Sequence, residues 1–168
     1  MTSNADKTEG SDPWAHFRYF LGSWRGRGDG KPGLSRIERS YRLVLNNRFI
    51  QINDRAVYEP QEANPEGEIH EEIGFLSFDE SRQTHVLREF HVEGFVNRYV
   101  LETCDAEAGQ LVFVTEAIEN IAPGWSARTT YDILSPDRFR ETFDLAGPEK
   151  PWACYMTNEF KRVEVGET

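Results

Sequence analysis

The sequence has only two cysteines, Cys104 and Cys154, and they form no CxxC pair. A dense disulfide framework is therefore not expected, and both thiols are predicted to be reduced and buried. Methionine is equally scarce, with two residues against eleven phenylalanines and six tyrosines. A chain with many aromatic residues and few methionines favours strands over a bundle of helices.

An excess of basic charge is also absent, because 19 Lys and Arg residues face 29 Asp and Glu residues, for a net charge of -10. This balance disfavours non-specific binding to nucleic acid or to an anionic membrane surface. No apolar run approaches the roughly 18 residues that a membrane-spanning helix needs. Residues 1–11 lack the apolar core of a signal peptide. These absences predict a cytoplasmic protein without nucleic-acid or membrane partners.

The length of 168 residues suits one domain with a sizeable core. Residues 1–11 are polar and are predicted to be a disordered tail, which leaves residues 12–164 as a single domain. Asp12 and Pro13 form a good helix start, with an N-cap followed by proline at the first helical position. Together with apolar residues at helical spacing, they predict a short helix over residues 13–21 that covers one end of the molecule.

After this helix, apolar and polar residues alternate in ten stretches that are separated by short loops. The expected strands are 23–27, 35–45, 48–58, 68–78, 83–92, 95–104, 110–119, 127–134, 138–144 and 152–163. Strands at this spacing indicate a sandwich or a barrel, and the short connections favour an up-and-down meander. A meander of this length closes most naturally on itself. We therefore predict an all-β, antiparallel, up-and-down barrel of about ten strands, with a sandwich as the alternative.

The segment from residue 22 to residue 30 has glycine at every second position and one tryptophan among them. Alternate residues of a strand share a face, so Gly22, Trp24, Gly26 and Gly28 are expected on one side. The glycines let another backbone or a ligand come close, while Trp24 fills the face. This pattern is typical of the first strand of a tightly curled barrel.

The chain has a predicted helix, then Gly-x-Trp, then a meander and a basic final strand. This order resembles the lipocalin and fatty-acid-binding-protein superfamily, whose members are calycin-like barrels. Barrels of this kind often place a tryptophan of the first strand beneath an arginine or lysine of the last. The resemblance implies that Arg162, or Lys161, lies over Trp24 in a cation–π contact of about 1 kcal/mol. Its role would be structural.

The longer glycine run and the Gly74–Phe75 pair resemble more closely the nitrobindin-like haem-binding barrels. Those barrels bind ferric haem through a histidine on the last strand, but residues 152–163 contain none. Tyr155 falls near the expected ligand position and Met156 lies next to it, and both residue types can ligate haem iron. A haem protein with a replaced proximal ligand is therefore one alternative function.

Charged and polar residues inside the central strands are the remaining signal. Burying a charge is costly unless it is paired, so such residues form ion pairs on the outer wall or line a wet cavity. We prefer the cavity, which would bind a small, partly apolar molecule, with arginine and histidine holding a carboxylate or other polar head. The expected ligand-binding residues are Arg39, Tyr41, His70, Arg88, His91, Arg98 and Tyr155.

Metal binding is not expected, because histidines in strands are usually structural. His70 and Glu72 share a face at a spacing that a metal could bridge, with His85 or Glu89 as the third ligand. His85 and His91 lie some ~20 Å apart along one strand and cannot share an ion.

Two further alternatives stay open. A small enzyme of the isomerase or cyclase type would need His91 to converge with Glu89 or Arg88 in the cavity. A homodimer through an exposed barrel face would need no ligand at all.

Overall fold

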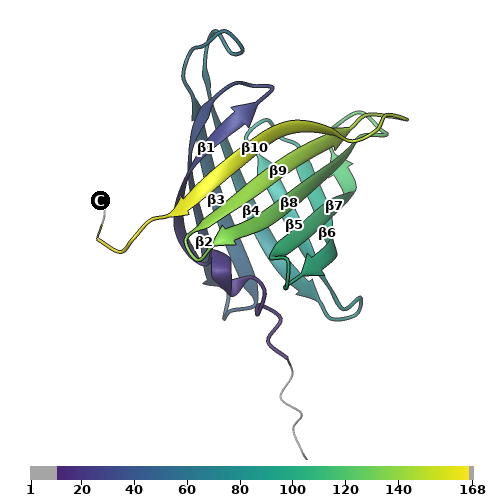
Figure 1. Cartoon of the computed structure of the whole chain (residues 1–168). Coiled ribbons are helices and arrows are strands. Elements are labelled where there is room, and N and C mark those ends of the chain that lie inside the picture. The colour runs from purple at the N-terminus through teal and green to yellow at the C-terminus, as the bar shows by residue number, and fades with distance from the viewer. Residues whose placement is uncertain (1–10, 167–168) are drawn as a thin grey trace, which may run out of the picture.

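The computed structural model describes residues 11–166, so the expected tail lies outside the described residues except for Ser11. Ten strands form a closed antiparallel barrel in which each strand pairs with the next and β10 pairs with β1 (Figure 1). The predicted all-β, up-and-down barrel is confirmed, and the sandwich is wrong. No helix within the described part is long and apolar enough to cross a membrane.

The strands differ from the predicted ranges by a few residues at most ends. They are β1 (Gly22–Gly30), β2 (Ser35–Val44), β3 (Phe49–Tyr58), β4 (Glu68–Asp79), β5 (Thr84–His91), β6 (Val96–Asp105), β7 (Gln110–Glu119), β8 (Ser126–Ser135), β9 (Arg138–Ala146) and β10 (Ala153–Arg162).

The predicted helix over residues 13–21 is only a 3-10 turn, η1 (Arg18–Phe20), preceded by irregular turns. Trp14, Phe17 and Phe20 are all buried and follow one another at intervals of three. A 3-10 helix has three residues per turn, so this spacing aligns the three rings on one side. The backbone bonds from Phe17 to Trp14 and from Phe20 to Phe17 have the same interval. Burial of the rings therefore selects the tighter turn over an α-helix.

The N-terminal segment covers one end of the barrel, which we call the closed end (Figure 1). The Trp14 indole donates a hydrogen bond to the Asn47 carbonyl at 2.9 Å, and the Tyr19 hydroxyl donates to the Ser135 carbonyl at 2.8 Å. Apolar side chains fill the barrel behind this segment. They are Phe17, Phe20, Tyr41, Ile50, Ile52, Leu76, Leu87, Leu111, Phe113 and Tyr131.

Trp24 and Arg162 join the two ends of the barrel wall. The Arg162 guanidinium lies 4.2 Å from the centre of the Trp24 ring. It also donates hydrogen bonds to the carbonyls of Tyr19 and Leu21, at 2.5 and 2.8 Å. The Trp24 indole itself donates to the Phe20 carbonyl at 2.7 Å. The Trp24 and Arg162 side chains therefore connect the first strand, the last strand and the N-terminal segment.

Strand β1 extends three residues past the predicted end at residue 27, because its glycines pair with β10 throughout. A Cβ on Gly26 would lie 2.7 Å from the Phe160 ring, and one on Gly28 would lie 2.5 Å from the Ser35 hydroxyl. The glycines therefore make room for side chains of the neighbouring strands rather than for a ligand. Gly22, at the start of the strand, has a positive φ of 116°.

Cys104 and Cys154 are both free and exposed, so the expectation of buried thiols is wrong.

Candidate functional site

The half of the barrel opposite the closed end contains a cavity of about 390 Å³. Its mouth lies between the loops that join β1 to β2, β3 to β4, β5 to β6 and β7 to β8. Much of its wall is apolar, formed by Ala56, Tyr58, Phe95, Tyr99, Ile118, Trp125, Phe143, Leu145 and Met156. The barrel is therefore packed solid in one half and hollow in the other.

A buried ionic cluster forms the floor of the cavity. Arg39 on β2 pairs with Asp54 on β3 at 2.5 Å and with Glu141 on β9 at 2.9 Å. Glu141 also accepts hydrogen bonds from Asn158 at 3.1 Å and Thr129 at 3.3 Å. Burial disfavours the charge of Arg39, but the two carboxylates hold its pKa well above the ordinary value. The guanidinium is therefore fully committed to groups of the protein.

The cavity wall carries more acidic than basic groups. Besides Asp54 and Glu141, it includes the carboxyls of Glu68, Glu72, Glu89 and Glu93, against the guanidinium of Arg39 and the imidazoles of His70 and His91. Burial raises the pKa of Asp54 to about 7 in spite of Arg39. Burial, with Glu72 and Glu141 nearby, also raises the pKa of Glu89 well above its usual range. Three polar atoms of the wall, His91 Nε2, Asn97 Oδ1 and Asn158 Oδ1, are buried and have no hydrogen-bond partner within residues 11–166.

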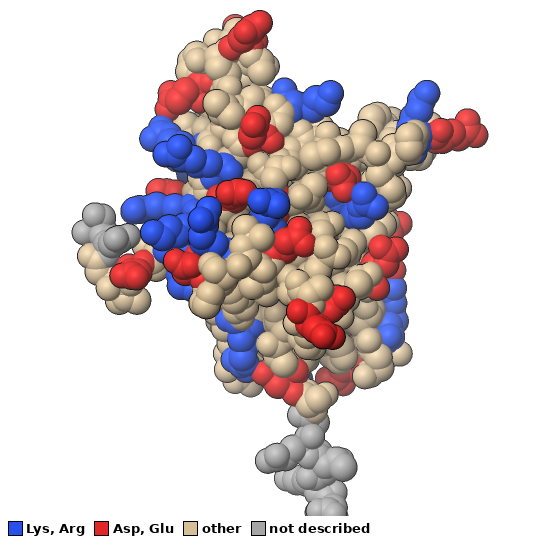
Figure 2. Space-filling view, viewed as in Figure 1, with Lys and Arg blue, Asp and Glu red and all other residues tan. Residues whose placement is uncertain are grey.

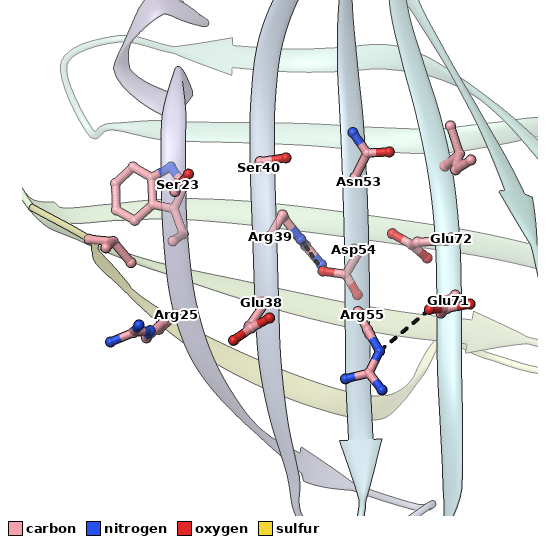
Figure 3. A pocket seen from close by; sticks show the side chains of 13 residues that line it. Ser23, Arg25, Glu38, Arg39, Ser40, Asn53, Asp54, Arg55, Glu71 and Glu72 are labelled. Atoms are coloured by element: carbon pink, nitrogen blue, oxygen red, sulfur yellow. Dashed lines mark hydrogen bonds and ion pairs between the residues drawn. The ribbon is translucent and has the colours of Figure 1, made fainter. Parts of the chain in front are cut away.

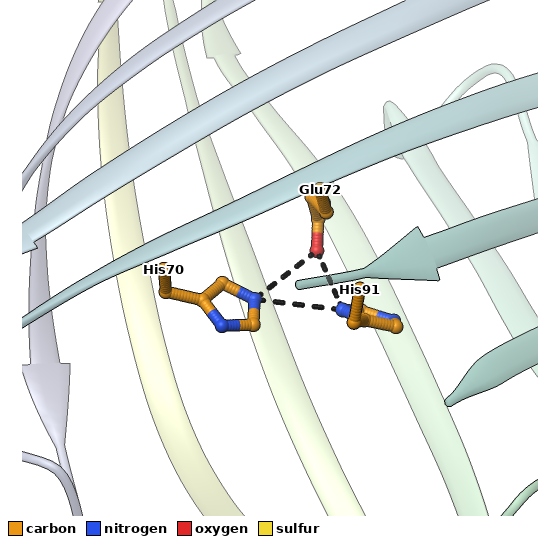
Figure 4. A group of neighbouring side chains, drawn as sticks. All are labelled: His70, Glu72 and His91. Atoms are coloured by element: carbon orange, nitrogen blue, oxygen red, sulfur yellow. Dashed lines mark hydrogen bonds and ion pairs between the residues drawn. The ribbon is translucent and has the colours of Figure 1, made fainter. Parts of the chain in front are cut away.

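A second polar cluster lies higher on the wall, where β4 and β5 run side by side (Figure 4). Glu72 lies directly opposite His91 in the strand register, and His70 is two residues before Glu72. The Glu72 carboxylate is 3.3 Å from His91 Nδ1 and 3.7 Å from His70 Nε2. The two imidazole nitrogens are 3.4 Å apart. All three side chains line the cavity.

The surroundings of this cluster hold both histidine rings in place. His70 Nδ1 donates a hydrogen bond to Glu93 at 2.8 Å, and the His91 ring stacks on Phe95 with centroids 4.1 Å apart. Glu72 and Glu93 raise the pKa of His70 to about 9 against the effect of burial. Burial opposes ionisation of Glu72, yet the hydrogen bonds of the two histidines hold its pKa below the usual range.

Two of the expected ligand-binding residues lie on the outer wall. Arg88 is exposed beside Ser77, and Arg98 is exposed and 3.6 Å from Glu116. In β5, the face that carries Leu87, Glu89 and His91 points inward, so Arg88 necessarily points outward. Neither arginine can orient a ligand in the cavity, and that part of the expectation is wrong.

The other expected residues have separate locations. Tyr41 lies in the apolar core of the closed end, where its hydroxyl accepts a hydrogen bond from Arg39 at 3.3 Å. Arg39, His70, His91 and Tyr155 line the cavity. The residue that completes the His70–Glu72 cluster is His91, and not His85 or Glu89 as considered from the sequence. His85 instead donates to the Pro13 carbonyl at 2.6 Å.

Sequence reasoning missed Asp54, Glu141 and Asn158 as members of the site. The signal was present in the alternation, because Asp54 follows Ile50 and Ile52 on one face of β3. Glu141 likewise lies between Phe139 and Phe143 on one face of β9. A charge that interrupts an apolar face marks a paired, buried group.

Two further hollows lie on the outer wall and carry weaker evidence of a site. One, of about 530 Å³, runs across β1 to β4 (Figure 3). Its outward side chains, such as Arg55 and Glu71 at 3.4 Å, pair with one another along the strands. A second, of about 640 Å³, has many basic side chains, which Figure 2 shows gathered where β1 and β10 meet. Exposed ion pairs such as Arg138 with Glu159 account for this surface without a ligand.

Haem does not fit the residues of the cavity. Burial raises the pKa of Tyr155, which disfavours the tyrosinate that would ligate iron. Met156 Sδ already accepts the Tyr58 hydroxyl at 3.8 Å, and Asn158 is hydrogen-bonded to Glu141. We therefore derive no chemistry through haem.

The paired groups proposed for an enzyme do not come together either. His91 contacts Glu72 rather than Glu89, and Arg88 lies outside the barrel.

Comparison with known proteins supports the fold. No protein-family model matches the chain, and no curated protein matches it in sequence. Among solved structures, Rv2717c from M. tuberculosis is similar with a TM-score of 0.67 and 18% identity, over 92% of this chain and 99% of that one. The S-type phycobiliprotein lyase CPES from Guillardia theta is similar with a TM-score of 0.53 and 14% identity, over 89% and 91%. At these identities the likeness shows the closed antiparallel β-barrel fold and nothing finer.

Proposed function

We propose that the barrel binds a small, partly apolar molecule whose head carries an amine or another hydrogen-bond donor. The cavity volume of about 390 Å³ falls within the range of about 300–1,000 Å³ that is typical of ligand pockets. Aromatic and aliphatic side chains form much of its wall. Ile121 and Trp125, both 43% exposed, extend this apolar lining to the mouth.

The head group follows from the acidic floor. Asn97 and Asn158 carry the proposal together with Glu89. The amide oxygens of both asparagines are buried on the cavity wall without a hydrogen-bond partner among the described residues, and the buried Glu89 carboxyl lies on the same wall. A buried acceptor without a partner favours a ligand that donates to it. A carboxylate head, which the sequence favoured, would face the six carboxyls of the wall, while Arg39 is already paired with Asp54 and Glu141. The preferred head is therefore a donor rather than an anion.

Isothermal titration with n-decylamine, n-decanol and n-decanoate tests this preference, because the three probes differ only in the head. We expect decylamine to bind more tightly than decanoate by tenfold or more, since hydrogen bonds to charged groups contribute about 1.5–3 kcal/mol. Glu89→Gln should reduce that preference to within a few-fold.

Glu71→Gln is the matched control, because Glu71 is the neighbour of Glu72 that points out of the barrel. It should bind all three probes as the parent does. Tighter binding of decanoate, or no binding of any probe, would refute the proposal.

A further inference from the structure

Three potential metal ligands from two adjacent strands converge at the cavity wall (Figure 4). Their nearest atoms, His70 Nε2, Glu72 Oε2 and His91 Nδ1, are separated by 3.3, 3.4 and 3.7 Å. A tetrahedral metal ion with bonds of about 2.0–2.2 Å holds its ligand atoms about 3.3–3.6 Å apart. The triangle therefore already has nearly the size of one face of a tetrahedral site.

We propose that His70, Glu72 and His91 bind a divalent transition metal ion, with Zn²⁺ as the best match. Two imidazoles and one carboxylate form a donor set that suits zinc, whereas calcium and magnesium prefer oxygen ligands alone. An octahedral ion with bonds of similar length would need the three atoms closer together than they are.

The contact of His70 with Glu93 has the form found in the second layer of a metal site. A metal-bound histidine usually donates its other ring N–H to a carboxylate, which fixes the ring. His70 does this toward Glu93 at 2.8 Å, and Nε2 is left facing Glu72 and His91. The stack of His91 on Phe95, with the rings 16° from parallel, holds Nδ1 toward the same point.

The electrostatics of the cavity favour a cation at this position. The wall carries six carboxyls against one guanidinium and two imidazoles, so a divalent ion offsets an acidic surplus. The side chains of Glu72 and His91 are only 13% and 7% exposed, so water screens the attraction weakly.

Three protein ligands leave a fourth coordination position, which faces the cavity because all three side chains line it. A site of this kind holds water or a donor atom of a bound molecule there. The metal site goes beyond the proposed ligand binding and does not depend on it.

The test measures Zn²⁺ binding to the full chain by competition with a chromogenic chelator. Cys104→Ser and Cys154→Ser form the parent background, because both thiols are free and exposed and thiolates are zinc ligands. We expect one Zn²⁺ per chain, and a Co²⁺-loaded form with the intense visible absorption of tetrahedral coordination. The Co²⁺ spectrum needs no further variant, so it stays informative if a ligand variant fails to fold.

The Zn²⁺ affinities of three variants test which residues hold the ion. His70→Asn should weaken Zn²⁺ binding by more than about a hundredfold, and Glu93→Gln by about tenfold to a hundredfold. His16→Gln, at an exposed histidine far from the cluster, should leave binding unchanged. Absence of stoichiometric binding to the parent, or equal affinity in His70→Asn, would overturn the metal site. If decylamine binds and Zn²⁺ does not, only the metal-site proposal is refuted. If Zn²⁺ binds and decylamine does not, only the proposal of an amine ligand is refuted.

Discussion

Removal of Arg39 should destabilise the barrel strongly and in a pH-dependent way. Arg39→Met keeps much of the side-chain volume but leaves the carboxyls of Asp54 and Glu141 buried without their cation. Breaking a buried pair in this way costs about 3–5 kcal/mol. With a denaturant slope of about 2 kcal/mol per molar urea, the unfolding midpoint should fall by about 2 M. Urea titrations followed by circular dichroism measure this shift.

The dependence on pH follows from Asp54, whose pKa of about 7 in the folded state exceeds the ordinary value of 3.8. Without Arg39 it rises further, so the folded variant binds more protons than the unfolded chain between those limits. Stability therefore falls as pH rises through this window, and the deficit of Arg39→Met should be large near pH 8 and much smaller near pH 5.

The control is Arg36→Met on the outer face of the same strand. Arg36 pairs with Glu59, but their side chains are 73% and 67% exposed, so the loss should stay within about 1 kcal/mol. Adding Asp54→Asn and Glu141→Gln to Arg39→Met should recover most of the stability, because no unpaired charge remains. A deficit below about 1 kcal/mol near pH 8, or one that does not change with pH, would contradict this account.

Two further predictions concern the wall and the closed end. Gly26→Ala should lower the free energy of unfolding by about 1–3 kcal/mol, because its Cβ would lie 2.7 Å from the buried Phe160 ring. The control is Gly147→Ala, whose Cβ would make only ordinary van der Waals contacts. Equal urea midpoints for the two variants would contradict the prediction. Burial lowers the pKa of His85 below the ordinary 6.5, so the folded state binds fewer protons than the unfolded chain and stability should fall as pH drops below about 6.5. His85→Gln should flatten this acid dependence in thermal unfolding, and an unchanged slope would show that another group causes it.

The barrel was predictable because its signals are local. Strand alternation, short loops and the Gly22–Gly30 pattern each depend on neighbouring residues, and each indicates the same closed meander. The α-helix was wrong because burial of three rings at intervals of three overrode the propensity signals at Asp12 and Pro13.

The candidate site was only partly predictable, because it depends on register and on which face points inward. Alternation shows that Glu89 and His91 share a face, but it does not show that this face is the inner one. The pairing of Glu72 with His91 depends on the hairpin between β4 and β5, which the sequence pattern leaves open. The prediction that Arg88 and Arg98 face the cavity was wrong for the same reason. Both faces of their strands carry charge, so the pattern does not show which face is the inner one.

The Trp24–Arg162 contact fixes where the chain enters and leaves the barrel. Strand β1 begins and strand β10 ends beside the N-terminal segment, at the opposite pole from the cavity mouth (Figure 1). A tag, a fluorophore or a tether joined at residue 11 or at residue 166 therefore starts from the end of the barrel that lies away from the opening. Immobilised on a sensor chip by one end, the protein would present its cavity to the flowing solution.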